Sequence, residues 1–546
     1  MKNTIYYLGI SLLLFLAAGC FEDESKIAQL PLPKITILSD NDAGIQRVAE
    51  AGIEYTLDCK INWGTEDSTQ YDYKWIYKNE VISTERFGKY TFNEMGQFPL
   101  GFEIVHRTTG LTYGTVFDLT VSTQFLLGWL ILAEGENEES MLHFIHIDSR
   151  KLFKDVYKGI YPDKPLGSKP VRLDQIPKND YDHVMVIQEG GEGTLELDGR
   201  TFAKVILLKD QFVGEKYPEN FEPVRYVNAW GGSPYGPEYL ISKDGKVYAR
   251  LDPDVNNFNQ AQFVTLPLDF GAETFITPLT HFPKPGYTQF FWDQLNRRWR
   301  VAFKSTAYDY ILSDFTRAKS YETDLANISG TVYDCFAGLP ENAELVYAET
   351  INEWGNTNEI VHIIKDPSGK LHYQKVVFYI RRRSATNVER ELRNIVQCEF
   401  GEEFAIDKDT KFWLLRGQNT DFQEEPHLFF NVGNKVYFYR SSNNKYYLYK
   451  DFSLGENPPT GKLVTMHTDA VVEKIGFGFS DGHFYICDLN PDEVVRSIAR
   501  GDIDPSNPEV DKQLELAHYT GLGKIVHSIF KYGRWQNWTG ARDDYR

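Results

Sequence analysis

The stretch YLISKDGKVYARL at positions 239–251 decides the fold of most of this 546-residue chain. Two runs rich in apolar and aromatic residues flank the pair Asp244-Gly245. Asp-Gly pairs favour the tight turns that join antiparallel strands, because glycine adopts positive φ angles without steric cost. The stretch therefore predicts a β-hairpin.

The same strand–turn–strand pattern recurs between positions 124 and 546. The clearest further copies are IVHIIKDPSGKLHYQKVVF at 360–378, LFFNVGNKVYFYR at 428–440 and IGFGFSDGHFYICDL at 475–489. Quasi-repeated strand–turn–strand units, here with irregular spacing, are typical of a β-propeller. Positions 124–546 are therefore predicted to form a propeller of about six to eight blades. Two further β-sandwiches are the alternative architecture.

Positions 34–123 show a second all-β pattern. In GIEYTLDCKINWG at 52–64, apolar residues alternate with other residues, as in a strand with one buried face. YDYKWIYKNEVIS at 71–83 repeats the alternation around Trp75. Several short strands of this kind predict an immunoglobulin-like β-sandwich, with Trp75 packed between its two sheets.

A short apolar run opens the chain. Positions 12–18 are strictly apolar, and Lys2 is the only charged residue before them. A spanning helix needs about 20 apolar residues, so the run is too short to cross a membrane and is interpreted as a signal peptide over positions 1–19. Positions 20–33 then form an acidic, proline-containing linker.

The end of this run carries a resemblance to a known class of protein. LAAGC at 16–20 resembles a bacterial lipobox, which implies that Cys20 becomes the lipid-modified N-terminus. The acidic residues that follow resemble the signal that sends lipoproteins of Bacteroidota to the cell surface, and an ordinary solvated linker is the alternative. These residues are Glu22, Asp23 and Glu24.

The predicted sandwich carries the same resemblance. FNEMGQFPLGFEIV at 92–105 and GTVFDLTVS at 114–122 are similar to the PKD-like modules of surface lipoproteins of Bacteroidota. The resemblance implies an outer-membrane, lipid-anchored protein facing the cell exterior. It also implies an accessory role in SusC/SusD-type TonB-dependent import, in which the protein captures or hands over an oligopeptide or glycan. A propeller hydrolase or lyase acting on that nutrient, and a scaffold without its own ligand, are the alternatives.

Composition narrows the class of partner. The chain has 58 Lys and Arg against 77 Asp and Glu, a net charge of −19. Nucleic-acid binding needs a basic surface, so a nucleic-acid partner is not expected. Membrane attachment is expected through Cys20 alone.

The sequence offers little catalytic chemistry. It contains no HExxH or GxSxG motif, and no catalytic residue, metal site or cofactor is assigned. His362 and His372 are interpreted as strand residues, and DIDPSNPEVD at 502–511 as a solvated loop rather than a calcium site. Because 77 acidic residues leave many possible carboxylate pairs, an enzyme remains the less favoured reading.

The remaining cysteines are widely spaced and form no CxxC pair. Two disulfides and four buried thiols are equally compatible with an exported protein. The residues are Cys59, Cys335, Cys398 and Cys487.

Two loops are candidates for ligand binding. NAWGGSPYGPEY at 228–239 places Trp230 and Tyr235 among glycines and prolines, and TINEWGNTNE at 350–359 places Trp354 among amides. Exposed aromatic rings beside hydrogen-bonding groups suit stacking on a sugar ring or a peptide side chain. The alternative is that each ring packs within a blade. Separately, Asp67-Ser68-Thr69 resembles an O-glycosylation motif of Bacteroidota, which implies Ser68 as an acceptor.

Overall fold

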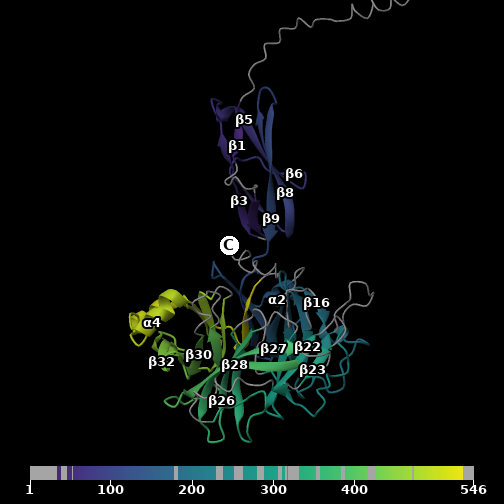
Figure 1. Cartoon of the computed structure of the whole chain (residues 1–546). Helices are drawn as coiled ribbons and strands as arrows, with labels where there is room; N and C mark the ends of the chain where they lie inside the picture. Colours follow the sequence, from purple (N-terminus) through teal and green to yellow (C-terminus); the bar gives the residue numbers. More distant parts are fainter. Residues whose placement is uncertain are drawn as a thin grey trace, which may run out of the picture. The chain divides into compact units, whose positions relative to one another are not determined.

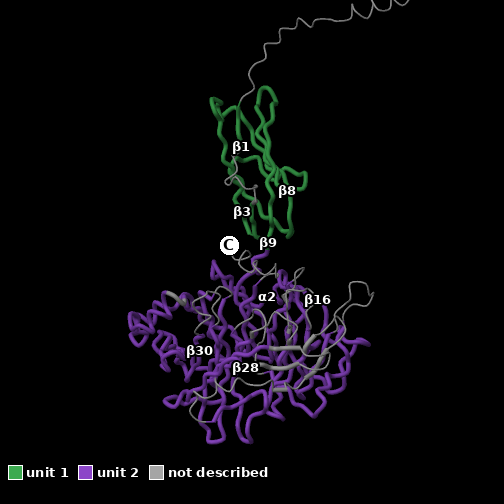
Figure 2. Tube along the Cα trace, in the orientation of Figure 1, with its two compact units in different colours: residues 1–122 green, residues 123–546 purple. Residues whose placement is uncertain are grey.

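The chain divides into two compact units, Met1–Ser122 and Thr123–Arg546 (Figure 2). The structure is a computed structural model, and it describes residues 34–38, 46–51, 53–177, 182–228, 238–250, 262–278, 288–304, 310–313, 316–317, 331–351, 357–382, 388–415, 426–469 and 472–532. Strands dominate both units (Figure 1), so the prediction of an all-β chain is confirmed. No helix in these described ranges is long and apolar enough to cross a membrane.

The described residues of the first unit form one five-stranded sheet and two short ladders. The sheet has the order β2-β9-β8-β5-β6, in which β2 runs parallel to β9 and the other pairs are antiparallel. Its strands are β2 (Gln46–Glu50), β5 (Tyr71–Tyr77), β6 (Glu80–Ser83), β8 (Gly96–His106) and β9 (Thr112–Ser122). The ladders pair β1 (Thr36–Leu38) with β4 (Lys60–Asn62) and β3 (Glu54–Leu57) with β7 (Gly88–Thr91), and a 3-10 turn, η1 (Ser68–Gln70), precedes β5.

Trp75 lies at the centre of the core of this unit. Its side chain is 0% exposed, and its ring contacts Phe102 and Phe117 at centroid distances of 4.4 and 5.9 Å. Its indole N–H donates to the carbonyl of Glu85 at 3.1 Å, so the one polar atom of the ring is also satisfied. The expectation that Trp75 is a core residue is confirmed.

Replacing this ring should weaken the first unit strongly. Trp75→Ala removes a fully buried aromatic side chain and is expected to cost about 3–5 kcal/mol of unfolding free energy. Val81→Ala in the same sheet is the control, because Val81 is 53% exposed and should change stability by only about 0.5 kcal/mol. Chemical denaturation of the full chain measures both variants. A loss below about 1 kcal/mol for Trp75→Ala would contradict the core assignment.

The described residues of the second unit form seven sheets that follow one another along the chain (Figure 1). Most are four-stranded antiparallel meanders, which is the organisation of β-propeller blades. The first is β12-β11-β10-β37, built from β10 (Gly128–Glu134), β11 (Ser140–His146), β12 (Leu152–Phe153) and β37 (Lys524–Lys531). The second and third are β13 (Ser168–Pro177), β14 (Asp182–Gly190), β15 (Leu195–Asp198) and β16 (Lys204–Leu207), then β17 (Pro223–Asn228), β18 (Glu238–Ser242) and β19 (Val247–Arg250).

The other four sheets complete the unit. The fourth is β20 (Ile276–Thr277), β21 (Thr288–Asp293), β22 (Arg298–Lys304) and β23 (Tyr310–Ser313). The fifth is β25 (Glu344–Thr350), β26 (Thr357–Lys365), β27 (Leu371–Arg382) and β28 (Val388–Phe400), with β24 (Thr316–Arg317) added parallel to β28. The sixth and seventh are β29 (Phe412–Leu415), β30 (His427–Val432), β31 (Lys435–Arg440) and β32 (Lys445–Asp451), then β33 (Leu463–Thr468), β34 (Lys474–Phe479), β35 (Phe484–Asp488) and β36 (Glu515–Tyr519).

The helical segments described in the second unit are short. They are α2 (Val156–Ile160), η2 (Leu208–Gln211), η3 (Phe452–Leu454), η4 (Pro491–Val495), α4 (Arg496–Arg500) and α5 (Pro508–Gln513).

The predicted turns lie where the sequence places them. Gly245 joins β18 to β19 with a φ of +78°, a conformation that favours glycine. The amide of Ser242 donates to the carbonyl of Lys246 at 2.9 Å and closes the turn. The further copies of the pattern turn at Gly369, Gly433 and Gly482, each at positive φ. Together with the sheet order, these hairpins support the β-propeller prediction.

The last described strand closes the series of sheets. β37 pairs antiparallel with β10, so the two ends of the unit share one sheet. β37 also contacts β13 and β33, β13 contacts β17, and β29 contacts β33. The first strands of the sixth, seventh, first, second and third sheets therefore adjoin one another, as inner strands do around the axis of a β-propeller. We call β37, β13, β17, β20, β25, β29 and β33 the inner strands.

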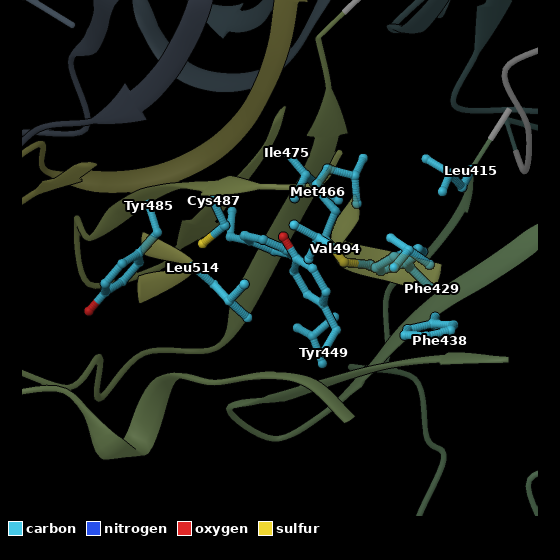
Figure 3. Packing of buried hydrophobic residues seen from close by; sticks show 14 of the residues in the cluster. Leu415, Phe429, Phe438, Tyr449, Met466, Ile475, Tyr485, Cys487, Val494 and Leu514 are labelled. Carbon is cyan, nitrogen blue, oxygen red and sulfur yellow. The ribbon is translucent and has the colours of Figure 1, made fainter. Parts of the chain in front are cut away.

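Successive sheets pack face to face through apolar side chains. Figure 3 shows the cluster between the sixth and seventh sheets, where Phe429, Phe438 and Tyr449 meet Ile475 and Cys487. The four cysteines of the described residues are free, which favours the thiol alternative over two disulfides. The sulfur of Cys487 is fully buried, and burial raises the pKa of its thiol.

A buried ion pair fixes the closing strand. The ammonium of Lys531 on β37 lies 2.6 Å from the carboxylate of Asp182 on β14, and it donates to the carbonyl of Leu126 at 3.1 Å. The side chains of Lys531 and Asp182 are 0% and 1% exposed. Burial lowers the pKa of Lys531, and the charge of Asp182 opposes that shift. The pair joins the C-terminal strand to the second sheet.

Breaking this pair should destabilise the second unit. Lys531→Ala leaves a buried carboxylate without its ammonium and is expected to cost about 3–5 kcal/mol, whereas the double variant Lys531→Met with Asp182→Leu should recover most of that loss. Lys524→Ala is the matched control on the same strand. Its partner Glu134 lies 2.9 Å away, but Lys524 is 60% exposed, so the loss should stay below about 1 kcal/mol. Equal losses in chemical denaturation for the Lys531 and Lys524 variants would contradict the role of the buried pair.

Candidate functional site

Polar side chains connect the inner strands on one side of the axis. Thr465 on β33 and Ser528 on β37 form a hydroxyl–hydroxyl hydrogen bond of 3.1 Å. His467 on β33 accepts from the amide of Phe530 at 3.4 Å, and His527 on β37 accepts from the amide of Leu173 on β13 at 3.5 Å. These groups already have hydrogen-bond partners within the protein, so we assign them a structural role.

Asp174 on β13 extends these contacts to the next inner strand. Its Oδ1 accepts from the Nε of Arg172 at 2.8 Å, and its Oδ2 accepts from the amide of Tyr226 on β17 at 2.9 Å. The side chain of Asp174 is 7% exposed, and that of Arg172 is 25% exposed. Because a guanidinium and a backbone N–H occupy both carboxylate oxygens, Asp174 is poorly placed to act as a general acid or base.

A second carboxylate lies on β25. Glu349 is buried and accepts a short hydrogen bond from the hydroxyl of Tyr347. The same hydroxyl accepts from the amide of Leu414 on β29 at 2.9 Å. On the other side of β29, the ring of Trp413 lies 4.5 Å from the ring of His467 on β33. Polar and aromatic contacts therefore continue from β25 to β33.

Arg225 on β17 differs from these residues because most of its donors are unused. Arg225 is only 3% exposed, and its Nη1 donates to the carbonyl of Pro278 at 3.1 Å. Within the described part of the chain, Nε and Nη2 have no hydrogen-bond partner. Burying a donor without a partner costs about 1–3 kcal/mol, and more for a charged group.

The electrostatic surroundings of Arg225 also leave its charge without a full set of partners. Burial is the main cause that lowers its pKa to about 9, and the charge of Arg172 adds to the effect. Asp174 and Glu349 oppose the shift but do not cancel it. The guanidinium is thus charged at neutral pH and incompletely compensated by its surroundings.

The inner strands that follow β17 also present unused hydrogen-bonding atoms. These atoms are buried and lack a partner among the described residues. They are Thr277 Oγ1 on β20, Thr350 Oγ1 on β25 and Trp413 Nε1 on β29. An indole N–H and a guanidinium are donors only, and a hydroxyl can donate. Four inner strands therefore each carry a buried group with an unpaired donor among the described residues, and we call Arg225, Thr277, Thr350 and Trp413 the axial donor set.

A surface hollow is lined in part by Trp292, which is the cross-strand partner of Thr277. It encloses about 430 Å³ between the β21–β22 turn and the start of β25, and it is lined by Trp292, Gln294, Arg297 and residues 342–345. The Nε of Arg297 already donates to the carbonyl of Leu339 at 3.2 Å, and Trp292 is 2% exposed. The Nε of Arg297 is therefore already hydrogen-bonded, whereas the Nε of Arg225 has no partner within the described residues.

The ligand-binding residues predicted from sequence cannot be placed. Trp230, Tyr235 and Trp354 lie outside the described residues, as do Cys20, Glu22, Asp23 and Glu24. Ser68 is described. It lies half-buried in η1, where the preceding Asp67 accepts from the amide of Thr69 at 3.0 Å.

The histidines and the acidic loop have structural roles. His362 is buried, accepts from the indole N–H of Trp299 at 3.1 Å and contacts Gln374 at 3.0 Å. In the loop at 502–511, Asn507 caps α5, and Asp511 lies 2.5 Å from the ammonium of Lys450. Across the described residues, no three His, Cys, Asp or Glu side chains gather as a metal site would require.

The axial donor set has almost no signature in the sequence. Arg225 lies in PVRYVNAW at 223–230, just before the predicted ligand-binding loop at 228–239. A charged residue inside an apolar strand was the only available signal. The lack of partners for its donors depends on strands that are distant in the sequence.

Comparisons with known proteins give no family. No protein-family model and no curated protein matches the chain. Similar solved structures include a quinonprotein alcohol dehydrogenase-like protein from Bacteroides thetaiotaomicron, with 10% identity, a TM-score of 0.33 and coverage of 91% of this chain and 96% of that chain. Dihydro-heme d1 dehydrogenase NirN has 9% identity, a TM-score of 0.32 and coverage of 85% and 75%. The Nup133 β-propeller domain of Vanderwaltozyma polyspora has 10% identity, a TM-score of 0.32 and coverage of 73% and 97%. Similarity at this level does not indicate a function for this chain.

Removing the buried charge of Arg225 should stabilise the protein. Arg225→Met removes buried donors that have no partner among the described residues and is expected to raise the unfolding free energy by about 1–3 kcal/mol. Arg300→Met is the control, because Arg300 is equally buried but pairs with Asp293 at 2.9 Å. Leaving the buried carboxylate of Asp293 without its cation should cost about 3–5 kcal/mol. If chemical denaturation shows that Arg225→Met destabilises as much as Arg300→Met, Arg225 is a structural residue.

Proposed function

We propose that this protein is a non-catalytic cell-surface lipoprotein that captures or hands over an oligomeric nutrient for a SusC/SusD-like outer-membrane importer. In this proposal Cys20 carries the lipid anchor, and residues 22–24 direct the protein to the exterior. The first unit serves as a PKD-like spacer or docking module. The propeller of the second unit binds the oligopeptide or glycan.

The axial donor set is the observation that carries the binding role. A folded protein rarely leaves a buried guanidinium and neighbouring donors without partners, and such groups call for a specific explanation. Binding of a ligand that carries hydrogen-bond acceptors would explain these unpaired donors. Stability is often sacrificed at sites that serve function. This pattern favours binding over a scaffold without a ligand.

The same groups argue against the enzyme alternative at this position. Acid–base hydrolysis of a glycoside needs two available carboxyl groups that flank the bond. The carboxylate oxygens of Asp174 are both occupied, and Glu349 accepts from Tyr347. Among these described residues the donors are unpaired and the two carboxylates are engaged, which supports capture rather than cleavage.

The anchoring part of the proposal predicts a clear change of location. Cys20→Ala should release the protein from the membrane fraction, because a single cysteine would carry the acyl chains. The variant with Glu22, Asp23 and Glu24 all changed to Ala should stay lipidated but become resistant to protease added to intact cells. Cys59→Ala, which alters a buried thiol instead, is the control and should leave the location unchanged.

Co-purification tests the importer part separately. The native lipoprotein, solubilised in mild detergent, should bring down a TonB-dependent transporter and its SusD-like lipoprotein. Recovery of the protein alone under conditions that keep such transporter pairs intact would contradict the accessory role. Membrane retention of the Cys20→Ala variant after alkaline extraction would contradict the lipid anchor.

A further inference from the structure

We propose that Arg225 binds a carboxylate group of the ligand, and that the two oxygens of this carboxylate pair with its Nε and Nη2 donors. This inference rests on the proposed function, because it specifies the chemistry of the oligomer that the propeller captures. The carboxylate could belong to the C-terminus of an oligopeptide or to a uronate residue of an acidic glycan.

The pattern of used and unused donors on Arg225 identifies the geometry. Nη1 is committed to the carbonyl of Pro278 at 3.1 Å, whereas Nε and Nη2 have no partner within the described residues. Nε–H and one Nη2–H point the same way from the planar guanidinium. They form the side-on fork that matches the two oxygens of a carboxylate. The single committed contact therefore holds the fork in place without occupying it.

Neighbouring groups favour a singly charged anion. The acids Asp174 and Glu349 and the cation Arg172 all act on Arg225 electrostatically, so an incoming anion meets two negative groups beside the guanidinium. A phosphate monoester carries a charge of about −1.5 to −2 at neutral pH and would be repelled more strongly by the two acids. A carboxylate adds one negative charge and satisfies the two unused donors.

The residues around the committed contact of Arg225 include an unpaired hydroxyl and groups exposed to solvent. Thr277 directly precedes Pro278, and its buried hydroxyl also lacks a partner within the described ranges. Pro278 itself is exposed, and the Arg172 side chain is 25% exposed. Arg225 thus lies just beneath groups that reach the solvent, where an extended oligomer could place one acidic group.

The test uses two defined probe pools with detergent-solubilised full-length protein. One pool contains short peptides from a casein digest, and the other contains oligogalacturonides. Each is offered as the free acid and as its methyl ester, which keeps the size but removes the charge. Equilibrium dialysis with mass spectrometry identifies retained oligomers, and calorimetric titration then measures their affinity.

The proposal expects one free-acid pool to be retained and its methyl ester to be lost. Retention of peptides identifies a peptide carboxylate, and retention of oligogalacturonides identifies a uronate. Arg225→Gln should weaken binding of the retained oligomer about 10- to 100-fold without lowering the melting temperature. Arg225→Lys keeps a positive charge but lacks the fork, so it should also bind more weakly. Arg107→Gln is the arginine control, because Arg107 forms an exposed ion pair with Asp72 in the first unit.

Several results would overturn the proposal. These are retention of neither free-acid pool, equal retention of acid and ester, wild-type affinity in Arg225→Gln, or wild-type affinity in Arg225→Lys. If Arg225→Gln fails to fold, the lysine variant alone decides the role of the fork. Because co-purification with the transporter does not depend on Arg225, a failure here leaves the importer role standing and removes only the carboxylate site.

Discussion

The pairing of β37 with β10 is the constraint on which the second unit depends. Lys524 of β37 and Glu134 of β10 form an ion pair although they are 390 positions apart in the chain. This pairing gives the first sheet its inner strand and brings that strand against both β13 and β33. The buried Lys531–Asp182 pair then joins the closing strand to the second sheet. Without this closure, the inner strands would have no common axis to surround.

Local features of the fold could be predicted from the sequence, whereas long-range pairings could not. Asp244-Gly245 predicts its hairpin because the turn depends on the conformational freedom of one glycine. Trp75 is predictable as a core residue because its strand alternates with period two. The partners of β37 are not predictable in this way, since β10 and β37 carry no complementary motif. The axial donor set escaped prediction for the same reason, because an unused donor on Arg225 is a property of the assembled ring.

The axis combines two different kinds of polar environment. On β33, β37 and β13, hydroxyl, imidazole and carboxylate groups are hydrogen-bonded to neighbouring inner strands. On β17, β20, β25 and β29, buried polar atoms remain without partners in the described structure. A uniform ring of paired groups would be more stable but would offer nothing to a ligand. The division of the axis therefore links the closure of the propeller to the proposed capture of an acidic oligomer.

Hydrogen exchange across β37 tests the closure most directly. If the strand completes the ring, the hydrogen-bonded amides of Lys524–Lys531 should exchange as slowly as those of β10, because both would open only when the whole unit unfolds. Mass spectrometry of peptides covering β10, β11 and β37 resolves the three strands. Fast exchange in β37 while β10 and β11 stay protected would show that the strand is a loosely attached edge, and the closed axis would be contradicted.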